Sequence, residues 1–174
     1  MDQAQGIRQM KNQKPVQVVA VTSGKGGVGK SNITVNLAVS LAQQGQNVLV
    51  MDGDLGLANI DVLLGLSPGY NLSHVINGEC SLEDTIIDGP EGIKIIPASS
   101  GTRSMADLSP AENAGIIRAF SELTTPIDTL LIDTAAGLSE SVVSYIRASR
   151  EVIVVVCDEP ASITDAYAMI KVMN

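Results

Sequence analysis

The sequence of 174 residues predicts an α/β fold in three layers: a mostly parallel, doubly wound sheet covered by helices on both faces. Short runs rich in Val, Ile and Leu recur along the chain, and segments of helical length separate them. Each run is apolar at successive positions rather than at every second one, which is typical of a strand buried on both faces. This alternation of strands and helices indicates right-handed crossovers between parallel strands.

The expected elements follow a regular order. Strands are predicted at Val16–Val21, Asn47–Met51, Ile93–Pro97, Thr129–Ile132 and Glu151–Cys157. A helix is predicted over Lys30–Gln44, and Gly45 ends it, because glycine readily adopts the left-handed conformation that closes many helices. A second helix is predicted to begin at Ser109 and Pro110, since serine caps helix N-termini and proline fits the first helical position. Apolar residues at helical spacing between Ala166 and Met173 also indicate a helix.

The chain divides into a tail and one predicted domain. Residues 1–15 are polar and rich in glutamine, which predicts a flexible N-terminal tail. Residues 16–174 are long enough to bury a sizeable core, and with aromatic residues at 2% that core must be aliphatic.

Composition excludes several classes of function. Eleven Lys and Arg against 19 Asp and Glu give a net charge of −8, which opposes a nucleic-acid binder, because such proteins need a basic face. No apolar run reaches the ~20 residues that a membrane-spanning helix needs. Cys80 and Cys157 form neither a disulfide framework nor a metal-binding motif, so a reduced, cytoplasmic setting is expected.

The strongest functional signal is a glycine-rich loop, SGKGGVGKS at residues 23–31, between the first strand and the first helix. Its glycines let successive N–H groups point at phosphate oxygens, and the following helix N-terminus adds a positive dipole end. Lys30 is expected to reach the β- and γ-phosphates, and the Ser31 hydroxyl to bind Mg²⁺. The pattern therefore predicts a P-loop NTPase. The residues expected to contact the nucleotide are Gly24, Lys25, Gly26, Gly27, Val28, Gly29, Lys30, Ser31 and Asn32.

Carboxylates follow two of the other predicted strands, at the edge where open α/β sheets bind ligands. Asp52 and Asp54 are two positions apart, so their side chains are expected on the same side of the extended chain. The alternative is a turn without a ligand, since Asp and Gly are also common in turns. Asp133 ends an aliphatic strand, which is the Walker B arrangement, with the carboxylate reaching Mg²⁺ through water. Gly137 suits a mobile switch segment that senses the γ-phosphate.

The remaining reactive side chains are expected to be structural. His74, the only histidine, has no nucleophile or metal ligand beside it. Cys157 is expected to be a small buried hydrophobic residue at the end of a strand, and Cys80 receives no role.

The loop resembles that of the deviant Walker A ATPases, the MinD/ParA-type family that includes MinD, ParA and the nitrogenase iron protein, because Lys25 precedes Lys30 within it. The resemblance implies that Lys25 crosses a face-to-face homodimer to the partner's nucleotide, as an arginine finger does; the alternative is a solvated loop lysine. It also implies that Asp54 positions the attacking water, while Asp52 and Asp54 join Ser31 and Asp133 around Mg²⁺. The catalytic residues are then Asp54, Lys25 and Lys30. The iron–sulfur branch is disfavoured because its cysteine pattern is missing.

Three segments narrow the choice within this family to the branch of the flagellar number regulators FlhG and FleN. Residues 52–65, DGDLGLANIDVLLG, are similar to MinD rather than to ParA, and residues 157–167, CDEPASITDAY, also fit the branch. In the tail, residues 2–8 resemble the DQAxxLR motif of FlhG, with Ile7 in place of leucine. The tail is therefore implied to contact a partner, although a disordered solubilising leader is the plainer interpretation. The implied contact residues are Asp2, Gln3, Ala4, Ile7 and Arg8.

The resemblance implies a slow ATP-hydrolysing switch that uses ATP and Mg²⁺, forms a homodimer with ATP and regulates flagellar number. The implied partners are a FleQ-type sigma-54-dependent activator, which FleN restrains, and an FlhF-type GTPase, with no direct contact to nucleic acid. Chains of this branch continue beyond the position of Asn174, where the resemblance places the adenine-contacting segment and an amphipathic helix for membrane contact at the inner membrane or cell pole.

Two other functions compete with this interpretation. A ParA-like partitioning ATPase would bind DNA non-specifically as a dimer, which the net charge of −8 opposes. A metabolic P-loop kinase would need an acceptor site, and the sequence offers no such group of residues. Retention on DNA with ATP, and ATPase activity without an acceptor, distinguish these alternatives.

Overall fold

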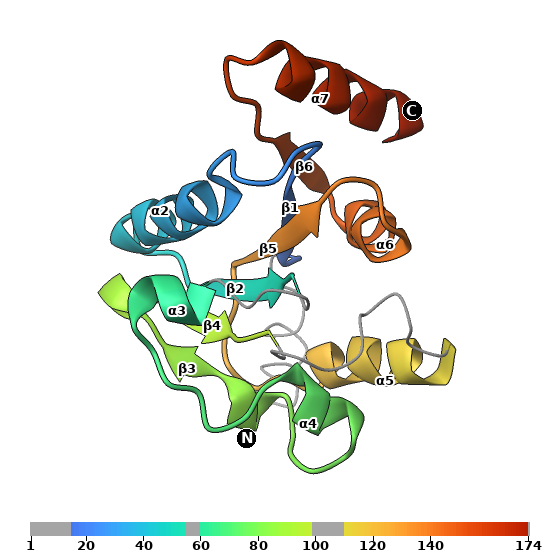
Figure 1. Ribbon diagram of the computed structural model, residues 1–174. Coiled ribbons are helices and arrows are strands. Elements are labelled where there is room, and N and C mark those ends of the chain that lie inside the picture. Colours follow the sequence, from blue (N-terminus) through green and yellow to red (C-terminus); the bar gives the residue numbers. More distant parts are fainter. Residues whose placement is uncertain (1–14, 55–59, 99–109, 174) are drawn as a thin grey trace, which may run out of the picture.

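The structure, a computed structural model, describes residues 15–54, 60–98 and 110–173 (Figure 1). Within these ranges one sheet has six strands in the order β3-β4-β2-β5-β1-β6. The strands are β1 (Gln17–Ser23), β2 (Val48–Gly53), β3 (Ile87–Asp88), β4 (Lys94–Ile96), β5 (Thr129–Ala136) and β6 (Glu151–Val154). The helices are α2 (Lys30–Gln43), α3 (Ile60–Leu64), α4 (Leu72–Ile76), α5 (Pro110–Ser121), α6 (Glu140–Ala148) and α7 (Pro160–Met173).

The pairing of the strands confirms the predicted mostly parallel sheet. Each predicted strand has a counterpart in β1, β2, β4, β5 or β6, and all pairs among these are parallel. Strand β3 pairs antiparallel with β4. Sequence patterns missed β3 because its two residues, Ile87 and Asp88, provide only one apolar side chain.

Helices cover both faces of the sheet, so the three-layer prediction is also confirmed (Figure 1). On one face Val35 of α2 and Ile60 of α3 belong to the same aliphatic cluster as Val50 of β2. On the other face Leu72 of α4 and Tyr145 of α6 join a second cluster, against which part of α5 packs. In Figure 1, α2 lies to the left of β1 and β5, and α5 and α6 lie to the right of the strands. Burial of aliphatic side chains on both faces of β2 and β5 explains why their sequences are apolar at successive positions.

The edge strand β6 departs from the prediction. It ends at Val154 rather than at Cys157, and its own residues are exposed or only half-buried. Among the residues that the structure describes, it pairs with β1. Cys157 lies beyond the strand and is partly exposed, so its prediction as a buried strand residue was wrong. The chain turns there towards α7, and the Cys157 amide donates a hydrogen bond to the Ser162 hydroxyl at 3.1 Å.

The predicted end of α2 and the predicted start of α5 agree with the structure to within one residue. Helix α2 ends one residue before Gln44, and Gly45 has a φ of 86°. Helix α5 begins at Pro110 as predicted. His74 is structural, since its Nδ1 accepts a hydrogen bond from the Asn71 amide at 3.1 Å and completes a capping box at the start of α4.

Several predictions fall outside the described residues. These are the cap at Ser109, the tail with Asp2, Gln3, Ala4, Ile7 and Arg8, and residues 55–59 of the segment after Asp54. Among the described helices, none combines the length and the apolar character needed to cross a bilayer.

Candidate functional site

The sheet order brings the predicted site residues to one edge. The glycine-rich loop follows β1, while Asp52 lies near the end of β2 and Asp133 within β5. Strand β5 lies between β1 and β2, and its Asp133 is level with Val21 of β1 and Asp52 of β2. The loop and both carboxylates therefore meet at the carboxyl ends of three adjacent strands, where ligands bind in open α/β sheets.

The second half of the loop forms a hollow of about 570 Å³. Gly29 has a φ of 92°, a left-handed conformation that a larger side chain rarely adopts, and Lys30 then begins α2. The helix starts without a side-chain cap and without an acidic residue in its first turn, so its amide groups remain available to an anion. The lining residues are Gly26, Gly27, Gly29, Lys30, Ser31, Asn32, Asp54, Val62, Leu63 and Ala136.

Asp133 lies close to Ser31 and Lys30, which line this hollow, and only 1% of its surface is exposed. Its Oδ1 accepts a hydrogen bond from the Thr34 hydroxyl of α2 at 3.3 Å. Burial raises the pKa of Asp133 above its usual range, while the Ser31 and Thr34 hydroxyls and the Lys30 ammonium act in the opposite direction. A buried carboxylate beside a serine hydroxyl fits a water-mediated Mg²⁺ site, because a divalent cation nearby would favour the charged form.

Asp52 is equally buried and helps to shape the chain after β2. Its Oδ1 accepts a hydrogen bond from the Asp54 amide at 3.1 Å, and its Oδ2 accepts one from the Ile60 amide at 3.2 Å. Asp52 thereby fixes where Asp54 leaves the sheet, and Asp54 lines the hollow beside Lys30. The contribution of Asp52 to a magnesium shell stays a prediction.

The first half of the loop faces a different neighbour. Lys25 does not line the hollow; its Nζ lies 2.6 Å from Oε2 of Glu159, in the connection between β6 and α7. Gly24 packs so closely on α7 that an added Cβ would lie 2.6 Å from the backbone carbonyl carbon of Asp165. The two lysines of the loop, Lys25 and Lys30, therefore lie in separate environments.

Sequence reasoning missed two residues at this edge. Thr34 follows Ser31 by three residues, a helical spacing that places the two hydroxyls on one face and could have indicated a bond to the same carboxylate, Asp133. Glu159 had no such signal, because 134 residues separate it from Lys25.

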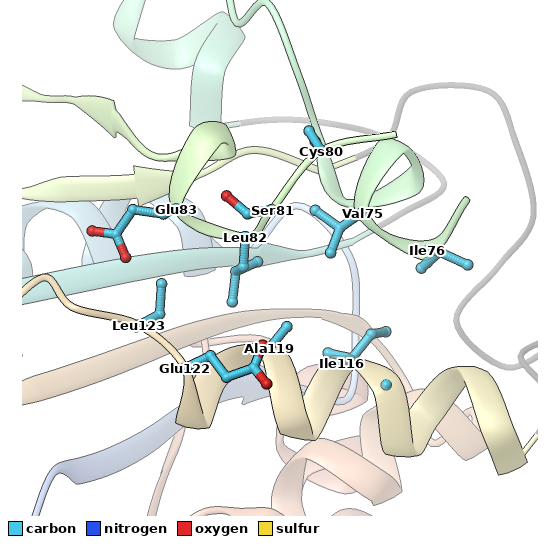
Figure 2. Close-up of a pocket in the computed structure, with 11 residues that line it drawn as sticks. Val75, Ile76, Cys80, Ser81, Leu82, Glu83, Ile116, Ala119, Glu122 and Leu123 are labelled. Carbon is cyan, nitrogen blue, oxygen red and sulfur yellow. The ribbon is translucent and has the colours of Figure 1, made fainter. Parts of the chain in front are cut away.

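A second hollow, of about 450 Å³, lies between α4 and α5 (Figure 2). Its lining is largely apolar, with Val75, Leu82, Ile116 and Leu123 among the side chains. Neither Lys nor Arg occurs among the described residues that line it, so it lacks the charge that a phosphate group needs.

In the described parts of the chain, no three His, Cys, Asp or Glu side chains cluster as a metal site would require. Mg²⁺ in nucleotide sites is usually held by one or two protein side chains together with phosphates and water.

Comparison with known proteins agrees with this geometry. A model of the family described as an AAA domain matches residues 16–174. The chain belongs to this AAA-domain family. Its resemblance to MinD/ParA-type ATPases close to FleN and FlhG is confirmed by relatives and structural neighbours alike.

Two curated relatives carry flagellar names. The chain is 58% identical to the antiactivator FleN of Pseudomonas aeruginosa over 168 residues, which cover 97% of this chain and 60% of FleN. It is 39% identical to the flagellum site-determining protein YlxH of Helicobacter pylori, over 92% of this chain and 55% of YlxH. The chain thus spans little more than half the length of the relatives that it matches.

A solved structure shares the fold. The septum site-determining protein MinD from Pyrococcus horikoshii, complexed with Mg-ADP, aligns with a TM-score of 0.73 at 30% identity, over 91% of this chain and 65% of that one.

Proposed function

We propose that this chain is the nucleotide-binding part of an ATP-hydrolysing molecular switch that regulates flagellar number. The observation that carries the proposal is the hollow at the sheet edge, where Lys30, Ser31 and Asp54 line one space and buried Asp133 lies close to Ser31. Family membership and the Mg-ADP complex of the related MinD support ATP and Mg²⁺ as its ligands.

The roles of the side chains follow from their positions. Lys30 and the amides at the start of α2 hold the phosphates, since charge-assisted hydrogen bonds are among the strongest available. Ser31, through its hydroxyl, and Asp133 and Asp52, through water, would hold Mg²⁺, which would supply positive charge beside the phosphates. Asp54 orients the attacking water from the wall of the hollow.

Dimerisation completes the site in this proposal. Lys25 lies outside its own phosphate hollow, so a role towards the partner's nucleotide agrees with its position better than a role within its own site. ATP brings two protomers together, Lys25 stabilises the transition state in the partner, and hydrolysis separates them.

The proposed flagellar role is based on the names of two relatives, the antiactivator FleN and the flagellum site-determining protein YlxH. In the whole protein, the ATP-bound dimer restrains a FleQ-type sigma-54-dependent activator. The tail, through Asp2, Gln3, Ala4, Ile7 and Arg8, acts on an FlhF-type GTPase. The protein acts in the cytoplasm, and a later amphipathic helix brings it to the inner membrane or cell pole.

Size-exclusion chromatography with ATP, with ADP and without nucleotide tests the switch. A dimer with ATP alone, together with phosphate release in the absence of any acceptor, is the expected result. A monomer under all three conditions would overturn the proposal, and ATP-dependent retention on non-specific DNA would favour a ParA-like partitioning role instead.

The tail has its own test. A peptide of residues 1–15 should stimulate the FlhF-type GTPase, and Gln3→Ala or Arg8→Ala should weaken the effect. Deletion of residues 1–14 should leave ATP hydrolysis intact. Loss of ATP binding after this deletion would assign the tail to the domain instead.

A further inference from the structure

Helix α6 places one aromatic side chain against the backbone that leads to Asp54. Tyr145 belongs to the second aliphatic cluster, and only 8% of its surface is exposed. A Cβ added to Gly53, the last residue of β2, would lie 3.1 Å from Cε2 of the Tyr145 ring. The ring therefore packs directly on the segment from which Asp54 enters the hollow.

Gly53 is needed at this position for space rather than for conformation. Its φ lies outside the left-handed region, unlike that of Gly29. Besides the Tyr145 ring, the carbonyl oxygen of Asp133 would lie 3.0 Å, and Cγ2 of Ile132 3.4 Å, from an added Cβ. Close packing of this kind leaves no room for a methyl group unless its neighbours move. The backbone at Gly53 is therefore held between α6 and β5.

The hydroxyl of Tyr145 is buried without a hydrogen-bond partner in the described part of the chain. Burial raises the pKa of Tyr145, and the Asp52 carboxylate acts in the same direction, so the phenol stays neutral. A buried donor without an acceptor lowers stability, because folding removes its hydrogen bonds to water. What Tyr145 contributes at this position is therefore its ring.

Helix α6 is also tied to the glycine-rich loop. The Gly137 amide, shortly before the helix, donates a hydrogen bond to the carbonyl of Ser23 at 2.9 Å. The Ser139 hydroxyl then caps the helix by accepting a hydrogen bond from the Val142 amide at 3.4 Å. The start of α6 is thus fixed beside the loop, while its Tyr145 ring reaches the end of β2.

We propose that Tyr145 is a positioning residue for hydrolysis: its ring fixes the backbone at Gly53 and thereby the place of Asp54 in the hollow. The inference rests on the proposed function, in which Asp54 orients the attacking water. Displacement of a reacting group by about 1 Å can slow a reaction on the order of 100-fold. Phosphate binding depends instead on Lys30 and the amides at the start of α2. Loss of the ring should therefore reduce turnover and leave ATP affinity nearly unchanged.

The test compares Tyr145→Leu with Tyr145→Phe in the full chain. Tyr145→Leu should lower kcat at least about 10-fold, while the ATP dissociation constant stays within about twofold. Tyr145→Phe keeps the ring and should keep kcat within about twofold of wild type, because the hydroxyl contacts no described acceptor. Phosphate release and calorimetric titration measure the two quantities. A Tyr145→Leu variant as fast as wild type, or a Tyr145→Phe variant as slow as Tyr145→Leu, would overturn the inference.

Val142→Ala is the matched control for loss of core volume. Val142 is also buried on α6, but it belongs to the cluster of Ala20 and Ile146. Its truncation should lower the melting temperature, because it leaves a cavity, and should leave kcat unchanged. A loss of kcat as large as that of Tyr145→Leu would show that hydrolysis follows the stability of α6 rather than the Tyr145 ring, and would also overturn the inference.

The double variant of Asp54→Ala with Tyr145→Leu separates this inference from the proposed function. If the ring acts through Asp54, its loss should slow hydrolysis no further once Asp54 is absent. Two effects that multiply would show that Tyr145 acts elsewhere and would contradict the positioning role. If Asp54→Ala alone hydrolyses ATP at the wild-type rate, the proposed role of Asp54 fails. If only Tyr145→Leu does so, the positioning role fails and the proposed function stands.

Discussion

The two halves of the glycine-rich loop have different neighbours although they adjoin in sequence. Residues 26–32 turn into α2, and all of them except Val28 line the hollow at the sheet edge, whereas Gly24 and Lys25 contact α7 and the connection that precedes it. The same motif thus serves two purposes that substitutions can separate. We expect changes in the second half to affect nucleotide binding within one protomer, and changes in the first half to affect what happens between protomers.

Lys25→Ala should have the largest effect. Loss of a cation that acts like an arginine finger should lower the hydrolysis rate roughly 10³-fold. ATP affinity of the monomer should stay within about twofold, because Lys30 and the loop amides remain. Steady-state phosphate release and calorimetric titration measure the two quantities. Equal damage to monomer binding would place Lys25 in its own site and remove the distinction between the halves.

Asp54→Ala should slow hydrolysis about 100-fold or more, as expected for a residue that orients or activates water. Binding should persist, since Asp54 lines the hollow without providing positive charge. Chromatography with ATP should then show a dimer that accumulates with time. Turnover at the wild-type rate would show that another residue orients the water.

Lys30→Ala should weaken ATP binding by at least about 30-fold, or about 2 kcal/mol, because it removes a charge-assisted contact to phosphate. Calorimetry on the monomer measures this loss directly. An unchanged dissociation constant would contradict the assignment of the hollow as the phosphate site.

Gly24→Ala and Gly26→Ala form a matched pair within the loop. A Cβ on Gly24 would lie 2.4 Å from the Asp165 Cβ, so α7 or the loop must move, whereas a Cβ on Gly26 meets nothing within 4 Å. We expect Gly24→Ala to lower stability by about 1–3 kcal/mol. Gly26→Ala should stay within about 0.5 kcal/mol. Thermal unfolding without nucleotide compares them, and equal melting temperatures would show that α7 does not close on Gly24.

The parts predicted well from sequence were those determined by neighbouring residues. Successive apolar positions located the buried strands, Gly45 marked the end of α2, and Pro110 the start of α5. The glycine pattern also located the loop that turns from β1 into α2 and lines a hollow, because its backbone conformation depends on its own residues.

Contacts between distant parts of the chain were not predictable in this way. The pairing of Lys25 with Glu159 depends on β6 lying beside β1, which no local pattern encodes. The error at Cys157 has a similar origin, since an apolar run does not show where the pairing of β6 with β1 ends. The bond from Thr34 to Asp133 likewise joins an early helix to a late strand.

Complementation between two inactive variants tests the central claim most directly. A mixture of Lys25→Ala and Asp54→Ala protomers contains mixed dimers in which one site has its own Asp54 and receives Lys25 from the other protomer. If Lys25 acts across the interface, equal amounts should recover up to about a quarter of the wild-type ATPase rate, because about half of randomly paired dimers are mixed and each holds one complete site. Activity no greater than the sum of the two separate variants would contradict the account, since it would show that Lys25 serves the nucleotide of its own protomer.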